Sequence, residues 1–277
     1  MNCVRAGSND IPQERHIVDQ QLNRHKLIFV LLWLLPVTFA STNVNAAIVL
    51  FDDTLGTLPS QQPWLLHAGF GIAEQTTPAG VRLTSSGPGQ GGYSNYALFA
   101  PKNPNFPVLD RNRGFTLELE LQLIAEAHSS PNRAGFSVIL LGSDSKGIEI
   151  GFWEDEVWAQ DDNPLFVKGE TASFDTQSEE VLYAISILAD RYSVAANNVE
   201  ILSGDVRDYG SFGLPYTLPN FLFLGDDTTS AQSDSNLGRI QLSQTISTPE
   251  PASVFAVGIG CIGIVAGNFL RRSRRKE

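Results

Sequence analysis

The sequence predicts an all-β fold made of two packed antiparallel sheets, over residues 47–245. Three observations support it. From Ala47 onward no stretch shows sustained helical periodicity. Short apolar runs with alternating polar residues follow one another instead, separated by Gly, Pro, Asn and Asp. About ten such runs within about 200 residues, with no crossover helix between them, favour an antiparallel sandwich over a parallel sheet.

The clearest predicted strand is GFTLELELQL, residues 114–123. Its apolar residues alternate with Thr, Glu and Gln, so one face should lie in a core and the other should face water. The other well-marked runs are GFSVILLGSD (135–144), GIEIGFW (147–153), VLYAISI (181–187), RYSVAA (191–196), NFLFLGDD (220–227) and GRIQLSQ (238–244). Weaker candidates are IVLFDD (48–53), VRLTSS (81–86) and YSNYALF (93–99).

The composition indicates a chain that can bury a core, and it shows that residues 47–247 form an acidic body. Of the 277 residues, 42% are hydrophobic and 18% are charged. Residues 47–247 hold 10 Lys/Arg against 25 Asp/Glu, a net charge of −15. Because affinity for nucleic acid rests on basic residues that neutralise phosphates, nucleic-acid binding is excluded.

Cysteine and histidine usage excludes several kinds of site. The two cysteines, Cys3 and Cys261, both lie outside the acidic body, which therefore forms no internal disulfide. There is no CxxC or Cys/His cluster of zinc-site spacing, and the four histidines are isolated. No Ser/His/Asp or Cys/His arrangement for nucleophilic catalysis is visible.

The N-terminal segment has the order of a secretory signal peptide. A basic flank at 24–26 precedes an apolar run over 27–40, which Pro36 interrupts. Fourteen residues are short for a membrane span and typical of a signal-peptide core. Small residues then allow cleavage between Ala46 and Ala47, so that 1–46 would be a signal peptide with a long n-region. An uncleaved anchor or a buried helix is the alternative.

The C-terminal segment predicts a transmembrane helix. After a linker at 246–251, residues 252–270 form 19 consecutive residues without a charge, about 28 Å of helix, which matches a bilayer core. The basic tail RRSRRKE (271–277) then acts as a stop-transfer cluster that stays cytoplasmic. If the N-terminal signal directs export and the basic C-terminal tail stays in the cytoplasm, the acidic body lies outside the inner membrane.

The same C-terminal region resembles the PEP-CTERM sorting signal, in which Pro-Glu-Pro, a transmembrane helix and an arginine cluster end the chain. The resemblance implies an exported bacterial protein that an exosortase, a membrane-embedded protease, cuts near the tripeptide. The two prolines hold the backbone extended, which keeps the helix out of the body. An ordinary tail anchor is the alternative. The residues concerned are Pro249, Glu250, Pro251, Arg271, Arg272, Arg274 and Arg275.

The body resembles laminin-G-like and concanavalin-A-like domains, which implies a jelly-roll sandwich. The run FLFLGDDTTSAQSDSNLGRIQLSQ (221–244) is similar to their closing strand pair, and 114–123 is similar to their central strand. The hairpin within 183–204 departs from the pattern, because Asn197 and Asn198 replace the usual turn glycine; asparagine tolerates the left-handed conformation. The overall pattern also resembles bacterial choice-of-anchor surface proteins, a name that carries no activity.

Laminarinase-type glycoside hydrolases share this fold and need two carboxylates that flank the scissile bond. Glu118 and Glu120 share a strand face, about 7 Å apart, but lack a third acid and an aromatic context. The acids of 154–156 stand at a predicted hairpin tip and alternate in direction. Solvated surface glutamates are the simpler interpretation. The sequence therefore predicts no catalytic residue and a protein that is not an enzyme, with the hydrolase kept as an alternative.

Binding of glycan or calcium is the favoured chemistry for the body. Aromatic rings stack on sugars, while Asp side chains accept hydroxyl hydrogens or ligate calcium. A buried tryptophan and a solvated acidic loop are the plain alternatives. The predicted glycan contacts are Trp153 and Trp158; the predicted calcium ligands are Asp161, Asp162, Asp226 and Asp227.

These observations predict an exported, membrane-tethered protein of the cell surface or extracellular matrix. Its sandwich would be non-catalytic and either structural or glycan-binding, with extracellular polysaccharide as a partner and no cofactor other than calcium. A glycoside hydrolase would instead show two convergent carboxylates in a cleft. A protein-binding adhesion module would show an exposed apolar surface without a sugar-sized cleft.

Overall fold

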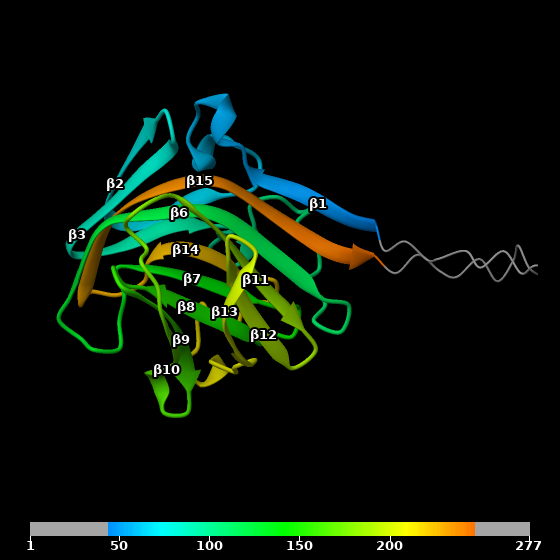
Figure 1. Ribbon diagram of the computed structural model, residues 1–277. Coiled ribbons are helices and arrows are strands. Elements are labelled where there is room, and N and C mark those ends of the chain that lie inside the picture. Colours follow the sequence, from blue (N-terminus) through cyan, green and yellow to red (C-terminus); the bar gives the residue numbers. More distant parts are fainter. Residues whose placement is uncertain (1–43, 247–277) are drawn as a thin grey trace, which may run out of the picture. The chain divides into compact units, whose positions relative to one another are not determined.

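The computed structural model describes residues 44–246 (Figure 1). The segment before Val44, the Pro-Glu-Pro tripeptide, the predicted membrane helix and the basic tail lie outside this range. Within the described part of the chain, no helix is long and apolar enough to cross a membrane.

The described residues form fifteen strands and three short 3-10 helices. The N-terminal elements are β1 (Val44–Phe51), η2 (Asp53–Leu55), η3 (Pro59–Gln61), β2 (Leu66–Thr77), β3 (Gly80–Ser94), β4 (Tyr96–Ala97) and β5 (Ala100–Pro101). The central ones are β6 (Phe115–His128), β7 (Phe136–Leu141), β8 (Gly147–Phe152), β9 (Glu156–Asp162) and β10 (Leu165–Ser173). The last ones are β11 (Val181–Leu188), β12 (Arg191–Ala196), β13 (Val199–Asp205), η4 (Gly210–Phe212), β14 (Leu222–Asp226) and β15 (Ala231–Ile246).

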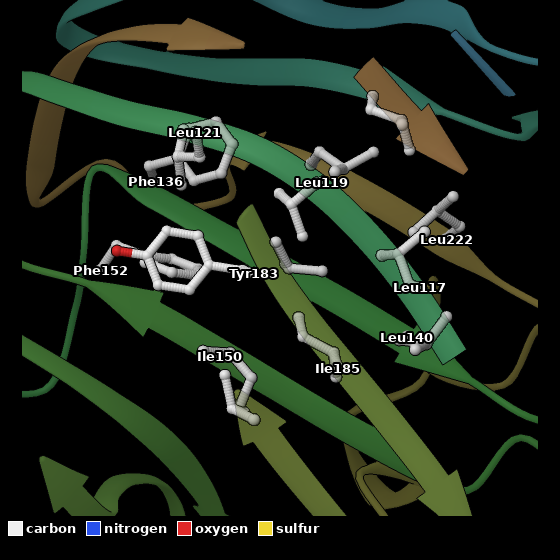
Figure 2. Close-up of a cluster of buried hydrophobic side chains, with 14 of the residues drawn as sticks. Leu117, Leu119, Leu121, Phe136, Leu140, Ile150, Phe152, Tyr183, Ile185 and Leu222 are labelled. Carbon is white, nitrogen blue, oxygen red and sulfur yellow. The ribbon is translucent and has the colours of Figure 1, made fainter. Parts of the chain in front are cut away.

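All pairs of strands are antiparallel, and the sheet folds back on itself to make two layers. The hydrogen-bonded path runs β10-β9-β8-β7-β14-β3-β15-β6-β11-β12-β13, with β1 added beside β15 and β2 beside β3. Strands β6 and β11 face β7 and β8 across the core (Figure 2). The prediction of an all-β antiparallel sandwich is confirmed.

The main core lies between these two layers. Strand β6 alternates buried and half-buried residues from Phe115 to Leu123, as its period-2 pattern predicts. Leu117, Leu119 and Leu121 face Phe136 and Ile150 of the opposite layer (Figure 2). Both apolar clusters of the body draw their residues from 48–242, so the body contains its own complete core and can fold as a unit.

The second layer is covered on both faces. Every residue of β7, β8 and β14 is buried, so the alternation of a half-exposed strand is absent. One face contributes Val138 and Leu140 to the main core, while Ile139 and Leu141 belong to a second cluster on the outer face. The connection 206–221, which includes η4, supplies Tyr209 and other residues that cover this outer face.

Most of the predicted strands are present, and three observed strands were not predicted. Strand β12 spans 191–196 as expected, and Asn197 and Asn198 have φ of 48° and 66°, as a left-handed turn requires. Strands β2, β5 and β10 were missed. Strand β2 has no buried residue and contains glycines at positive φ, so it carries no period-2 signal.

The predicted cleavage position lies inside a paired strand. Ala46 and Ala47 belong to β1, where they pair with Gln244 and Ser243 of β15. A cut between the two alanines would remove three residues from the start of β1, and the rest of the strand would keep its pairing.

Candidate functional site

A cavity of about 450 Å3 lies on the outer face of the second layer. Segments far apart in the sequence form it: β2 and β3, the β4–β5 hairpin, β7, the start of β10, the connection 206–221 and β14. Its volume is in the range of small-molecule sites. The lining includes Gln90, Tyr96, Leu98, Arg133, Ile139, Phe166, Phe212, Tyr216, Leu218, Phe221, Phe223 and Asp227.

Strand register sets the apolar floor of the cavity. Ile139 of β7 pairs with Phe223 of β14 on one side and with Glu149 of β8 on the other. These three residues therefore form a row on the outer face. Ile139 and Phe223 line the cavity, while Glu149 lies behind it under Tyr216.

Aromatic rings form one wall. The ring of Phe166 lies 5.0 Å from Phe212 and 5.2 Å from Tyr216, measured between centroids. The guanidinium of Arg133 stands 4.4 Å from the centroid of Phe166. Phe212 keeps 56% of its surface exposed, so its ring is the aromatic side chain of this wall that is open to a ligand.

Two residues of the lining have a strained backbone. Leu98 and Phe166 have φ of 60° and 59°, values that bulky L-residues rarely adopt. Among the described residues other than glycine with positive φ, they are the two large apolar ones. Strain of this kind tends to occur at ligand-binding positions.

A buried acidic pair supports the polar side of the cavity. The Tyr216 hydroxyl donates to Oε2 of Glu149 at 2.5 Å and to Oδ2 of Asp227 at 3.4 Å. Nη1 of Arg133 lies 3.8 Å from Glu149 and 4.0 Å from Asp227. Oε1 of Glu149 and Oδ1 of Asp227 are buried and accept no hydrogen bond within the described part of the chain.

The environment of this pair favours its protonated form. Burial raises the pKa of Glu149 well above its usual range, and the nearby charge of Asp227 raises it further. Burial also raises the pKa of Asp227, against the opposing effect of Arg133. Because two carboxylates so close to one hydroxyl do not readily both ionise, we assign the proton of the pair to Glu149, which is fully buried.

Asp226, the last residue of β14, is buried and also lines the cavity. Its Oδ1 accepts from the backbone N–H of Thr228 at 3.0 Å, and its Oδ2 has no partner among the described residues. Burial raises the pKa of Asp226 to about 7.

The two predicted glycan contacts lie elsewhere. Trp158 is fully buried against Gly151, so its ring offers no face to a sugar. Trp153 is half-buried between two partners: the His128 ring stacks on it at 3.9 Å, and Nζ of Lys168 lies 3.2 Å from its centroid. Both partners lie against the indole, which also lines a second pocket together with Glu126 and Phe174.

The predicted calcium ligands are divided between two places. Asp161 forms an ion pair with Nε of Arg207 at 3.2 Å, and Asp162 accepts from the backbone N–H of Asp208 at 2.7 Å. Strands β7 and β8 separate their strand, β9, from β14, which carries Asp226 and ends before Asp227. Within the described residues, no three His, Cys, Asp or Glu side chains are grouped to hold a metal ion.

The carboxylates considered for hydrolysis are engaged in surface contacts. Glu118 accepts from Gln241, and Glu120 accepts from the backbone N–H of Arg239 at 3.0 Å. Glu156 forms an ion pair with Lys168 at 2.5 Å.

Sequence reasoning missed most of the cavity. Of its polar groups, only Asp226 and Asp227 were singled out, and for a different role. One signal was present: Glu149 interrupts the strand GIEIGF, which is otherwise apolar or glycine. A charged residue in an otherwise apolar strand indicates that a polar partner covers it on the second face of the sheet. No local pattern identifies Arg133, Tyr216 or Phe212.

No family model matches the chain, and neither does any curated protein. Solved structures give distant likenesses. One is a carbohydrate esterase from Shiga toxin-encoding bacteriophage phi24B, at TM-score 0.49 and 12% identity, covering 73% of this chain and 100% of the other. Another is the Crh5 transglycosylase in complex with NAG, at 0.46 and 11%, covering 76% and 86%. A third is the VIP36 exoplasmic/lumenal domain in its Ca2+/Man-bound form, at 0.43 and 9%, covering 69% and 86%. Likenesses of this size assign neither family nor function.

Proposed function

We propose that this chain is an exported, surface-destined protein whose sandwich binds carbohydrate in the outer-face cavity without catalysing a reaction. The observation that carries this proposal is the cavity itself, which combines an open aromatic ring with a carboxylate acceptor. Phe212 is open for stacking, and Asp227 lines the cavity with 14% of its side chain exposed.

The chemistry of a sugar ring fits both features. A pyranose has an apolar C–H face that packs on an aromatic ring, and its hydroxyls donate hydrogen bonds to carboxylates. Asp227 lines the cavity as an acceptor, and Arg133 and Gln90 add donors. A ligand hydroxyl can donate to the part of the Asp227 carboxylate that is exposed in the cavity, and such a hydrogen bond is worth more in a desolvated site than at the surface.

The glycoside hydrolase alternative requires two carboxylates that face one bond. Glu149 and Asp227 do converge, but Glu149 has no exposed surface and lies behind Tyr216. Of this pair only Asp227 lines the cavity, and the other carboxylate of the lining is its neighbour in the sequence, Asp226. This arrangement supports binding without hydrolysis.

The adhesion alternative predicts an exposed apolar surface without a sugar-sized cleft. The exposed Phe212 adjoins a cavity of about 450 Å3, which favours a small polar ligand over a flat protein partner. Export and exosortase processing complete the proposal and rest on sequence alone: the N-terminal apolar run, the C-terminal tripeptide, the apolar run that predicts a membrane helix, and the arginine cluster. An exported protein of this kind would meet extracellular polysaccharide, which is therefore the proposed class of ligand.

Isothermal titration of the purified body, residues 44–246, against a panel of neutral and acidic oligosaccharides tests this function. At least one glycan should bind, and Phe212→Ala should weaken it about tenfold or more, because an apolar ring contact is lost. The matched control is Leu188→Ala, which changes an exposed apolar residue at the end of β11 and should bind as the parent does. Binding that Phe212→Ala leaves intact would place the site elsewhere. If the body releases reducing ends from a glycan and Glu149→Gln abolishes this release, the protein is an enzyme instead.

A further inference from the structure

The β4–β5 hairpin exposes two large apolar side chains in its turn, and one of them, Leu98, lines the cavity. Its two-residue turn consists of Leu98 and Phe99, which are 86% and 72% exposed. Such turns normally use Asn, Asp or Gly, because the backbone there adopts positive φ. Leu98 has φ of 60°, so an unfavourable residue occupies a strained and solvated position. Neither turn geometry nor burial in the sandwich explains this choice.

The apolar surface continues from the mouth into the cavity. Leu98 and Phe212 line the cavity at the outside, and Leu218, Phe223 and Ile139 line it inside. The charged residues of the lining, Arg133, Asp226 and Asp227, are far fewer than its apolar ones. Leucine and isoleucine have no ring on which a sugar could stack, and they pack well against hydrocarbon.

We propose that the cavity takes an amphiphilic glycan, a sugar that carries an alkyl or acyl chain. This inference rests on the proposed carbohydrate function and specifies the ligand class of the same site. The sugar would lie against Arg133 and Asp227, and its chain would run along Leu218 and leave over Leu98 and Phe212. The apolar mouth is continuous with the sugar cavity, so a single ligand can bury both surfaces.

Titration of the body, residues 44–246, with methyl, butyl, hexyl and octyl β-glucoside below their micelle concentrations tests the proposal. Affinity should rise about fourfold for each methylene that becomes buried, because burial of one methylene contributes about that factor. The gain in affinity per methylene comes from the alkyl chain of the glucoside, so the test does not require glucose to be the preferred sugar. Leu98→Asn should reduce the increment, and asparagine tolerates the left-handed backbone at this turn. Leu188→Asn is the matched control and should leave the increment unchanged.

The outcomes separate this inference from the carbohydrate function. Equal affinity for methyl and octyl glucoside, with glycan binding intact, would overturn the inference and leave the proposed function standing. Equal losses in Leu98→Asn and Leu188→Asn would overturn it as well. If octanol binds as tightly as octyl glucoside, the sugar is dispensable and both proposals are wrong.

Discussion

The hydroxyl of Tyr216 lies 2.5 Å from Oε2 of Glu149, and it donates its hydrogen to this fully buried carboxyl group. Tyr216 belongs to the connection that covers the outer face of the second layer, while Glu149 belongs to strand β8 beneath it. This one contact ties a loop to a strand and forms the back of the cavity.

Tyr216→Phe should lower the free energy of unfolding by about 1–3 kcal/mol, because it leaves a buried acceptor without its donor. The control is Tyr183→Phe. The hydroxyl of Tyr183 is buried and has no partner in the described part of the chain, so its removal should cost nothing or stabilise slightly. Urea unfolding of the body monitored by fluorescence measures both. Equal losses in the two variants would contradict the importance of the Tyr216 contact.

Stability should fall as the pH rises from about 4 to about 7. An aspartate in the unfolded chain titrates near pH 4, whereas burial raises the pKa of Asp226 to about 7. Between these values the folded protein binds more protons than the unfolded chain, so deprotonation favours unfolding. The loss from Asp226 is up to about 4 kcal/mol, since each pKa unit corresponds to about 1.4 kcal/mol.

Asp226→Asn removes this titrating group and should flatten the dependence. The measurement is the unfolding free energy of the parent and the variant at pH 5 and pH 8. The raised pKa of Glu149 acts in the same direction and leaves a residual slope. An identical difference between the two pH values in both proteins would rule out Asp226 as the source.

Gly151→Ala should destabilise the body by about 1–3 kcal/mol, the usual cost of overpacking. A Cβ at this position would lie 2.6 Å from the ring of Trp158, which is fully buried and has no room to move. Gly169→Ala is the milder comparison, since its nearest neighbour would stand at 3.2 Å. Thermal unfolding by circular dichroism compares the two. A Gly151→Ala melting temperature equal to that of the parent would show that Trp158 is less tightly held than described.

Glu250→Ala should leave the sandwich folded and exported but change its processing. The physical reason is that the tripeptide lies beyond β15, the last strand of the sandwich, and both core clusters end before it. Mass spectrometry of the protein from cell and medium fractions measures where the chain is cut. Leu188→Ala serves as a processing control. Unchanged C-terminal cleavage in Glu250→Ala would reduce the tripeptide to a hinge.

The sequence by itself determined the strands whose side chains alternate. In β6 a single period-2 pattern of leucines and glutamates specifies both faces, because one face is buried by a sheet and the other is left to water. The Asn197 and Asn198 turn was predictable for a similarly local reason, since asparagine tolerates positive φ.

Only the tertiary structure decided the cavity and its chemistry. Glu149 and Arg133 come from two separate segments of the chain, while Phe212 and Tyr216 come from a third, and they meet because β8 lies beside β7 and the connection 206–221 folds over both. The same long-range packing buried Trp158 against Gly151 and placed His128 and Lys168 against Trp153. Periodicity reports which face of one strand is buried, whereas a site depends on which strands and loops are brought together, and that is set by the fold as a whole.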